Sequence, residues 1–147
     1  MRQKETERME AERREIRAQI RECEATIDDF NGEFGRLNQK IEQQQEAKSR
    51  YDNMCVQVEE AKARKRGSTR GIEPYVRNIK FLYGYQSRMY EFLDGQRAAG
   101  NRKCMEDVAE RMANTINSNL QRREELRRQI AACHDKITEL CRELGGI

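Results

Sequence analysis

Apolar residues recur along the first half of the chain at alternating steps of four and three residues. Two interleaved classes of positions share this seven-residue period: Ile20, Ile27, Phe34, Ile41 and Cys55 in one, and Ile16, Cys23, Phe30, Leu37, Tyr51 and Val58 in the other. Such a period is typical of an amphipathic helix whose apolar stripe faces another helix. We therefore predict one long helix over about residues 3–64.

The apolar stripe is interrupted by Gln44 and Lys48, within the segment QQQEAKS. Polar residues at the buried positions of a coiled coil select its register or its partner at a cost in stability. A gap filled by solvent is the alternative, and the sequence favours neither. The apolar stripe in the second half of the chain weakens in the same way near Asn117, Asn119 and Arg123, so both predicted helices carry a polar interruption.

Helical spacing resumes in the second half of the chain after a group of helix-breaking residues. Residues 65–74 contain Gly67, Gly71 and Pro74, and they predict a loop. A second helix is predicted over about residues 75–144, with a break near residues 95–101. Folding back at the loop makes residues 1–147 one all-α domain, an elongated antiparallel helical hairpin with coiled-coil-like heptads and a short interrupted middle segment. Whether residues 72–95 form a separate helix stays open at this point.

The composition leaves little material for a core. Charged residues make up 37% of the chain and hydrophobic residues 36%, so the helices bury few side chains between them. The regular apolar period argues against a disordered chain. A thin core beside two long apolar stripes predicts a helical partner, which is either a different protein or a second copy of this chain.

The net charge of +3 comes from 29 basic and 26 acidic residues, a balance that makes nucleic acid an unlikely partner. Residues 62–70 nevertheless form a local basic patch of Lys62, Arg64, Lys65, Arg66 and Arg70. A solvated tip between two helices is one interpretation of this patch, and a site for an anionic partner is the other. The sequence shows neither a membrane-spanning apolar run nor a secretory leader, so we expect a cytoplasmic protein.

No pattern of residues predicts catalysis, a metal site or a cofactor. His134, the only histidine, directly follows Cys133, and neighbouring residues of a helix point to different faces. The five cysteines show no metal-ligand spacing, and Cys133 and Cys141 stand at apolar-stripe positions, as small buried side chains do. We therefore expect a protein that acts by binding and has no enzymatic activity.

Most aromatic residues lie in one segment, NIKFLYGYQSRMYEFLDG, at residues 78–95. Within it, Leu82, Tyr83 and Gly84 stand where the small Esx-like (WXG-type) proteins of bacterial type VII secretion carry a W-x-G turn, although this sequence lacks the tryptophan. Tyr90 follows six residues later, which is similar to that family. The layout also resembles the small helical proteins encoded beside LXG toxins. Under this resemblance, the rings pack at the hairpin turn and Gly84 permits a close backbone approach there.

The resemblance implies a targeting partner, which packs against the helical N-terminal domain of an LXG toxin, with or without a second small helical protein, and helps to present the toxin for export. Such a protein stays in the cytoplasm or leaves with its toxin. The family's export signal, Y-x-x-x-D/E, is matched by Tyr90–Asp94, although here it lies in the middle segment. A homo-oligomeric structural coiled coil, serving as a scaffold or tether, is the alternative function. The residues expected to bind the partner come from the apolar stripes and the aromatic–glycine element: Ile16, Ile20, Ile27, Phe30, Phe34, Leu37, Ile41, Leu82, Tyr83, Gly84, Tyr90, Met112, Ile116, Ile130, Ile137 and Leu140.

Overall fold

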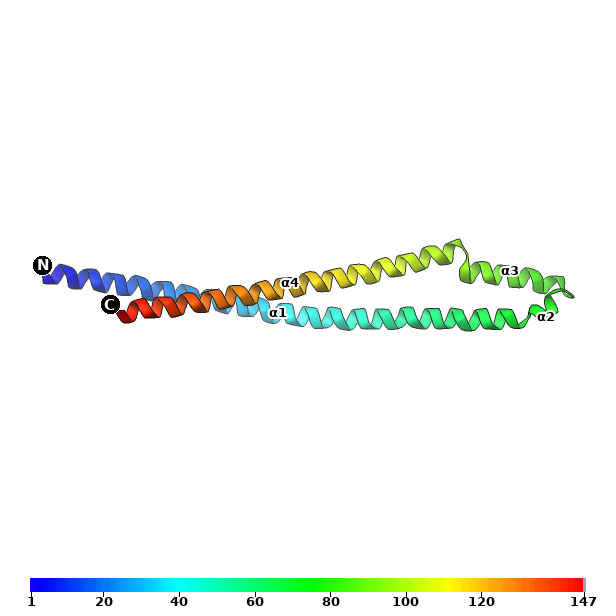
Figure 1. Ribbon diagram of the computed structural model, residues 1–147, viewed down its shortest axis with the longest axis horizontal. Coiled ribbons are helices and arrows are strands. Elements are labelled where there is room, and N and C mark those ends of the chain that lie inside the picture. Colours follow the sequence, from blue (N-terminus) through cyan, green and yellow to red (C-terminus); the bar gives the residue numbers. More distant parts are fainter. Residues whose placement is uncertain (147) are drawn as a thin grey trace. The chain divides into compact units, whose positions relative to one another are not determined.

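The computed structural model describes residues 1–146, and the chain is all-α over that range, as predicted. Four helices follow one another in the order shown in Figure 1: α1 (Arg2–Gly71), α2 (Glu73–Val76), α3 (Lys80–Asp94) and α4 (Gln96–Gly146). Two compact units divide the chain, and both contain parts of α1 and α4. Unit 1 comprises residues 1–42 and 117–147, and unit 2 comprises residues 43–116.

The first helix is longer than predicted, because α1 continues to Gly71 through most of the predicted loop at residues 65–74. The two glycines within this extension cost roughly 1 kcal/mol each relative to alanine. Burial of Thr69, whose hydroxyl donates to the Lys65 carbonyl at 2.8 Å, favours the helical conformation there. The chain turns instead over residues 72–79. Pro74 stands in the first turn of α2, and Ile79 adopts an extended conformation immediately before α3.

The break predicted near residues 95–101 is confined to Gly95, which separates α3 from α4. Its N–H donates to the carbonyl of Glu91 at 2.8 Å and so caps α3, while its carbonyl accepts the first bond of α4 from the N–H of Ala99 at 3.0 Å. Leu93 and Ala98 are buried on either side of the break. Gly95 therefore joins two packed helices through a single residue.

The predicted turn at Leu82–Gly84 is wrong. These residues lie inside α3, and Gly84 has helical neighbours on both sides. A Cβ atom at Gly84 would have the Arg88 side chain at 4.0 Å as its nearest neighbour, so no close backbone approach requires glycine here. The rings do not pack at a turn either, because Tyr83 and Phe81 are exposed. The helix continues through Gly84, although glycine and the neighbouring tyrosines have a lower helix propensity than alanine or leucine.

In unit 1, α1 packs against α4 through the predicted apolar stripes. The buried side chains are Cys23, Ile27, Ile41, Leu126 and Leu140. Polar contacts flank this core: Arg122 Nη2 lies 2.9 Å from Glu33 Oε1, and the Arg127 guanidinium stands 5.5 Å from the centre of the Phe34 ring.

In unit 2, α1 is joined to α3 and α4 mainly by polar contacts. These contacts pair residues in opposite chain order: Tyr51 with Met105, Glu59 with Arg102, and Arg66 with Asp94. The segments are therefore antiparallel within this unit. The buried side chains of unit 2 are few: Thr69, Gln86, Leu93, Ala98 and Ile116. The Gln86 amide donates to Glu73 Oε2, which ties α2 to α3.

Candidate functional site

The packing of α1 on α4 is incomplete within unit 2. Among the described residues of α1, none is buried between Ile41 and Thr69, and on α4 none is buried between Ala98 and Ile116. The polar interruption of the apolar stripe lies at the start of this stretch. Lys48 forms an ion pair of 2.7 Å with Asp52 on its own helix. No side chain of the two helices is fully buried in this stretch, although the stripe residues Tyr51 and Cys55 are half-buried there.

A groove of about 660 Å³ occupies part of this open stretch. Half of its lining consists of small or apolar side chains, and the other half is charged and mostly acidic. The apolar group is Cys55, Val56, Ala63, Met105 and Ala109, and the charged group is Asp52, Glu59, Glu60, Arg102 and Glu106. An apolar groove bordered by charged groups is the usual form of a site that receives an amphipathic helix.

A second groove of about 360 Å³ lies in the adjoining stretch of the same two helices. It is lined by Gln44, Ala47, Val108, Arg111, Met112 and Thr115. This second groove is a separate hollow. We refer to the first one, of about 660 Å³, as the unit 2 groove. Its lining on α1, residues 52–63, corresponds to about 18 Å of helix at 1.5 Å per residue.

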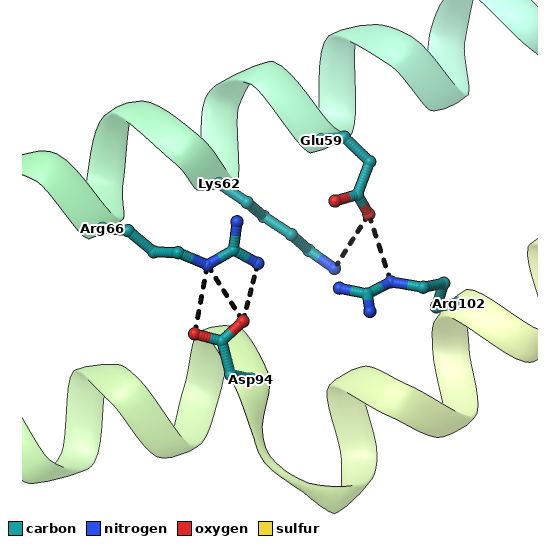
Figure 2. A network of polar contacts seen from close by, with 5 residues as sticks. All are labelled: Glu59, Lys62, Arg66, Asp94 and Arg102. Carbon is teal, nitrogen blue, oxygen red and sulfur yellow. Dashed lines mark hydrogen bonds and ion pairs between the residues drawn. The ribbon is translucent and has the colours of Figure 1, made fainter.

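A network of charged side chains borders the unit 2 groove, and Figure 2 shows its five members. Arg66 of α1 forms an ion pair with Asp94 at the end of α3. The Nε atom of Arg66 donates to both carboxylate oxygens of Asp94, at 2.9 Å to Oδ1 and 3.1 Å to Oδ2, and Nη2 lies 2.6 Å from Oδ1. Glu59, which lines the groove, pairs with Arg102 at 3.6 Å and with Lys62 at 3.8 Å. The network fixes α1 against both sides of the Gly95 break.

The ion pair also changes the acidity of its members. Hydrogen bonding from Arg66 lowers the pKa of Asp94 below its ordinary value, and nearby Arg102 and Lys62 act in the same direction. The same hydrogen bond raises the pKa of the Arg66 guanidinium. Further along α1, burial raises the pKa of the Tyr51 hydroxyl, which donates to the Met105 carbonyl at 3.2 Å. All of these groups keep their usual charge at neutral pH, so their role is positional.

The residues predicted to bind a partner differ in how far the chain itself buries them. Those on the two long helices of unit 1 are buried (Ile27, Ile41, Leu140) or half-buried (Ile16, Ile20, Phe30, Phe34, Leu37, Ile130, Ile137). In unit 2, Ile116 is buried, Met112, Leu82, Gly84 and Tyr90 are half-buried, and Tyr83 is exposed. Buried side chains have no free surface to offer, whereas contact of the others with a partner stays a prediction.

None of the predicted partner-binding residues lines the unit 2 groove, whereas Met112 lines the second groove. Sequence reasoning missed Val56 and Ala109 as site residues, since neither stands on the predicted stripe. The signal that could have found the groove is the polar interruption at Gln44 and Lys48, together with small side chains that follow it on α1. The Y-x-x-x-D match also has a structural use, because Asp94 is held by Arg66.

The charged and aromatic surface around α2 forms a second candidate site in unit 2, separate from the groove. Arg64, Lys65 and Arg70 of the predicted basic patch are exposed, and within residues 1–146 they form no ion pair. Arg66 and Lys62 belong to the network of Figure 2 instead.

Comparison of this chain with protein-family models, curated proteins and solved structures finds no match.

Proposed function

We propose that the protein is a non-catalytic binding partner that receives an amphipathic helix of another protein in the unit 2 groove. One observation carries the proposal: apolar side chains of α1 and α4 face a groove of about 660 Å³ in a stretch where neither helix has a fully buried side chain. A third helix would fill the groove and remove these side chains from water. Burial of apolar surface is the main favourable contribution to association of this kind.

The lining of the groove defines the chemistry of the incoming helix. Its length of about 18 Å matches a helix of about 12 residues. Small side chains at Ala63 and Ala109 allow close approach of a partner backbone. Glu60 and Glu106 make the border acidic on balance, because Asp52 is paired with Lys48, and Glu59 with Arg102 and Lys62. The complementary helix therefore carries an apolar stripe with spacing of three and four residues, flanked by lysine or arginine.

The architecture included in this proposal is a helical hairpin with a coiled-coil-like seam, in which α1 and α4 are the two arms. The antiparallel pairing within unit 2 and the burial of the heptad positions Ile27 and Ile41 in unit 1 support it. A hairpin with one open stretch becomes a three-helix bundle when a partner helix is added.

The resemblance to the small proteins encoded beside LXG toxins narrows the partner to the N-terminal helical domain of such a toxin. The support is the layout of two long helices around an aromatic middle segment. The motif Leu82–Gly84 no longer adds to this support, because it lies within α3. In this narrower form, the protein is a targeting factor that presents the toxin for type VII secretion.

The test is light scattering coupled to size exclusion, on the protein alone and mixed with the N-terminal domain of an LXG toxin from the same genome. The expected result is a stoichiometric complex. Val56 is 55% exposed within the groove, so Val56→Glu leaves the fold intact and places a carboxylate where the partner helix packs. We expect affinity to fall by at least about thirtyfold, which corresponds to about 2 kcal/mol.

Met54→Glu is the matched control, because Met54 lies two residues away, is 45% exposed and does not line the groove. It should bind like the unchanged protein. Equal losses for both variants, or none for either, would rule out the groove as the site. A stable homo-oligomer that ignores the toxin domain and dissociates on Val56→Glu would instead establish the structural coiled coil as the function.

A further inference from the structure

Large apolar side chains are exposed around α2 and α3. Tyr75, Ile79, Phe81, Tyr83 and Phe92 have exposed fractions between 48% at Ile79 and 77% at Phe92. The connection between α2 and α3 lies at one end of unit 2 (Figure 1). Phe81 and Phe92 are eleven residues apart and share one face of α3, with Arg88 between them. This face differs from the one that buries Gln86 and Leu93.

The same part of the chain holds a strong concentration of positive charge. Residues 62–92 carry eight lysines and arginines against two acidic residues, Glu73 and Glu91, a net charge of +6 in a chain whose total is +3. The rest of the chain is therefore acidic on balance. Glu73 accepts a hydrogen bond from the Gln86 amide. Arg70, Arg77, Lys80 and Arg88 are exposed around the rings.

We propose that this basic aromatic tip, residues 62–92, binds the surface of a membrane that contains anionic phospholipids. The rings of Phe81 and Phe92 and the side chain of Ile79 would enter the boundary between headgroups and acyl chains. The surrounding lysines and arginines would bind the negative headgroups. This arrangement of apolar and cationic groups on one short segment is the recognised requirement for interfacial binding.

A hollow beside the rings offers a place for a headgroup. It measures about 560 Å³ and is lined by Glu73, Val76, Arg77, Lys80, Tyr83 and Gln86. Arg77 supplies the planar guanidinium that phosphate oxygens bind in pairs, and Lys80 adds a second positive charge. Within residues 1–146, no helix has the length and apolar character needed to cross a bilayer.

The apolar side chains favour a membrane over a nucleic acid as the anionic partner. Both partners would attract the positive charge, and aromatic rings can stack on bases. Ile79 has no ring to stack, and Phe81 and Phe92 project from a convex helix face on which no groove for a strand is found. An interface between headgroups and acyl chains accepts all of these side chains together. This proposal does not rest on the unit 2 groove.

The first experiment uses tryptophan as a reporter, because the chain contains none. Phe81→Trp should show a blue shift of its emission and protection from iodide when vesicles of phosphatidylcholine with about one third phosphatidylserine are added. Met9→Trp, at an exposed position of unit 1, should show neither change. Vesicles of phosphatidylcholine alone should leave both spectra unchanged. Absence of a shift at Phe81→Trp with the anionic vesicles would overturn the proposal.

The second experiment is vesicle flotation of the full chain at about 0.1 M salt. Arg77→Glu with Lys80→Glu should weaken binding to the anionic vesicles by at least about tenfold. The matched control, Arg128→Glu with Lys136→Glu, changes the net charge equally at exposed positions of unit 1 and should bind like the unchanged protein. If both variants bound the anionic vesicles more weakly to the same degree, the overall charge would explain the effect. Specific binding by the tip would then be refuted. Tighter binding to a single-stranded oligonucleotide than to the vesicles would assign the tip to nucleic acid instead.

Discussion

Replacement of Gly95 by alanine tests the account of the break between α3 and α4. A Cβ atom at this position would collide with the carbonyl oxygen of Glu91, a backbone atom that cannot rotate away. That oxygen accepts the capping hydrogen bond from the Gly95 N–H at 2.8 Å. Relief of the collision must therefore move the last turn of α3 and break or lengthen this bond. Gly84→Ala is the matched control, because only the Arg88 side chain lies near the added atom, at 4.0 Å.

The two substitutions should change the free energy of unfolding in opposite directions. Both variants restrict the unfolded chain similarly, so this contribution cancels between them. Gly84→Ala replaces a poor helix former inside α3 and should stabilise the protein by about 0.5–1 kcal/mol. Gly95→Ala should lose about 1 kcal/mol for the capping hydrogen bond and about 1 kcal/mol for looser packing of Leu93 and Ala98, which flank the break. We expect a difference of about 2–3 kcal/mol between the variants.

The assay is urea unfolding of the three proteins, followed by circular dichroism, with the slope of the transition compared among them. A Gly95→Ala protein as stable as Gly84→Ala would refute the steric argument and show that glycine is dispensable at the break. A Gly84→Ala protein that is destabilised would refute its placement within a regular helix, and would restore the interpretation of Leu82–Gly84 as a turn.

Two further predictions concern the core of unit 1 and the ion pair of unit 2. Leu126 has an exposed fraction of 0%, so Leu126→Ala should cost about 3 kcal/mol, whereas half-buried Leu120→Ala should cost clearly less in thermal unfolding. Equal Tm values for these two variants would contradict the assigned core. Because the pKa of Asp94 is lowered in the folded protein, its pairing with Arg66 stabilises the folded state at pH values above the ordinary pKa of aspartate. This stabilisation disappears as the pH falls through the pKa that Asp94 has in the folded protein. Asp94→Asn should therefore be less stable than the unchanged protein at neutral pH, and the difference should vanish well below about pH 4; a difference independent of pH would exclude the ion pair as its cause.

The candidate site was only partly accessible to sequence reasoning. Periodicity identified which residues form apolar stripes, and Cys55 of one stripe lines the unit 2 groove. It could not reveal that the stripes separate between Ile41 and Thr69, because separation depends on which residues of α4 lie opposite α1. The exposure of Val56 and the burial of Ile116 follow from that pairing. The chemical type of these two side chains does not distinguish them from other apolar residues nearby in the sequence.

The sequence by itself determined the helical class, the heptad positions that are buried in unit 1 and a break in the region of residues 95–101. These properties depend on residues within a few turns of one another, through helix propensity and the period of the stripe. The structure placed Gly71 and Gly84 within helices, against the local preference of glycine. Tertiary structure alone decided that Asp94 meets Arg66, because this contact joins residues that are 28 positions apart and depends on which part of α1 lies opposite α3.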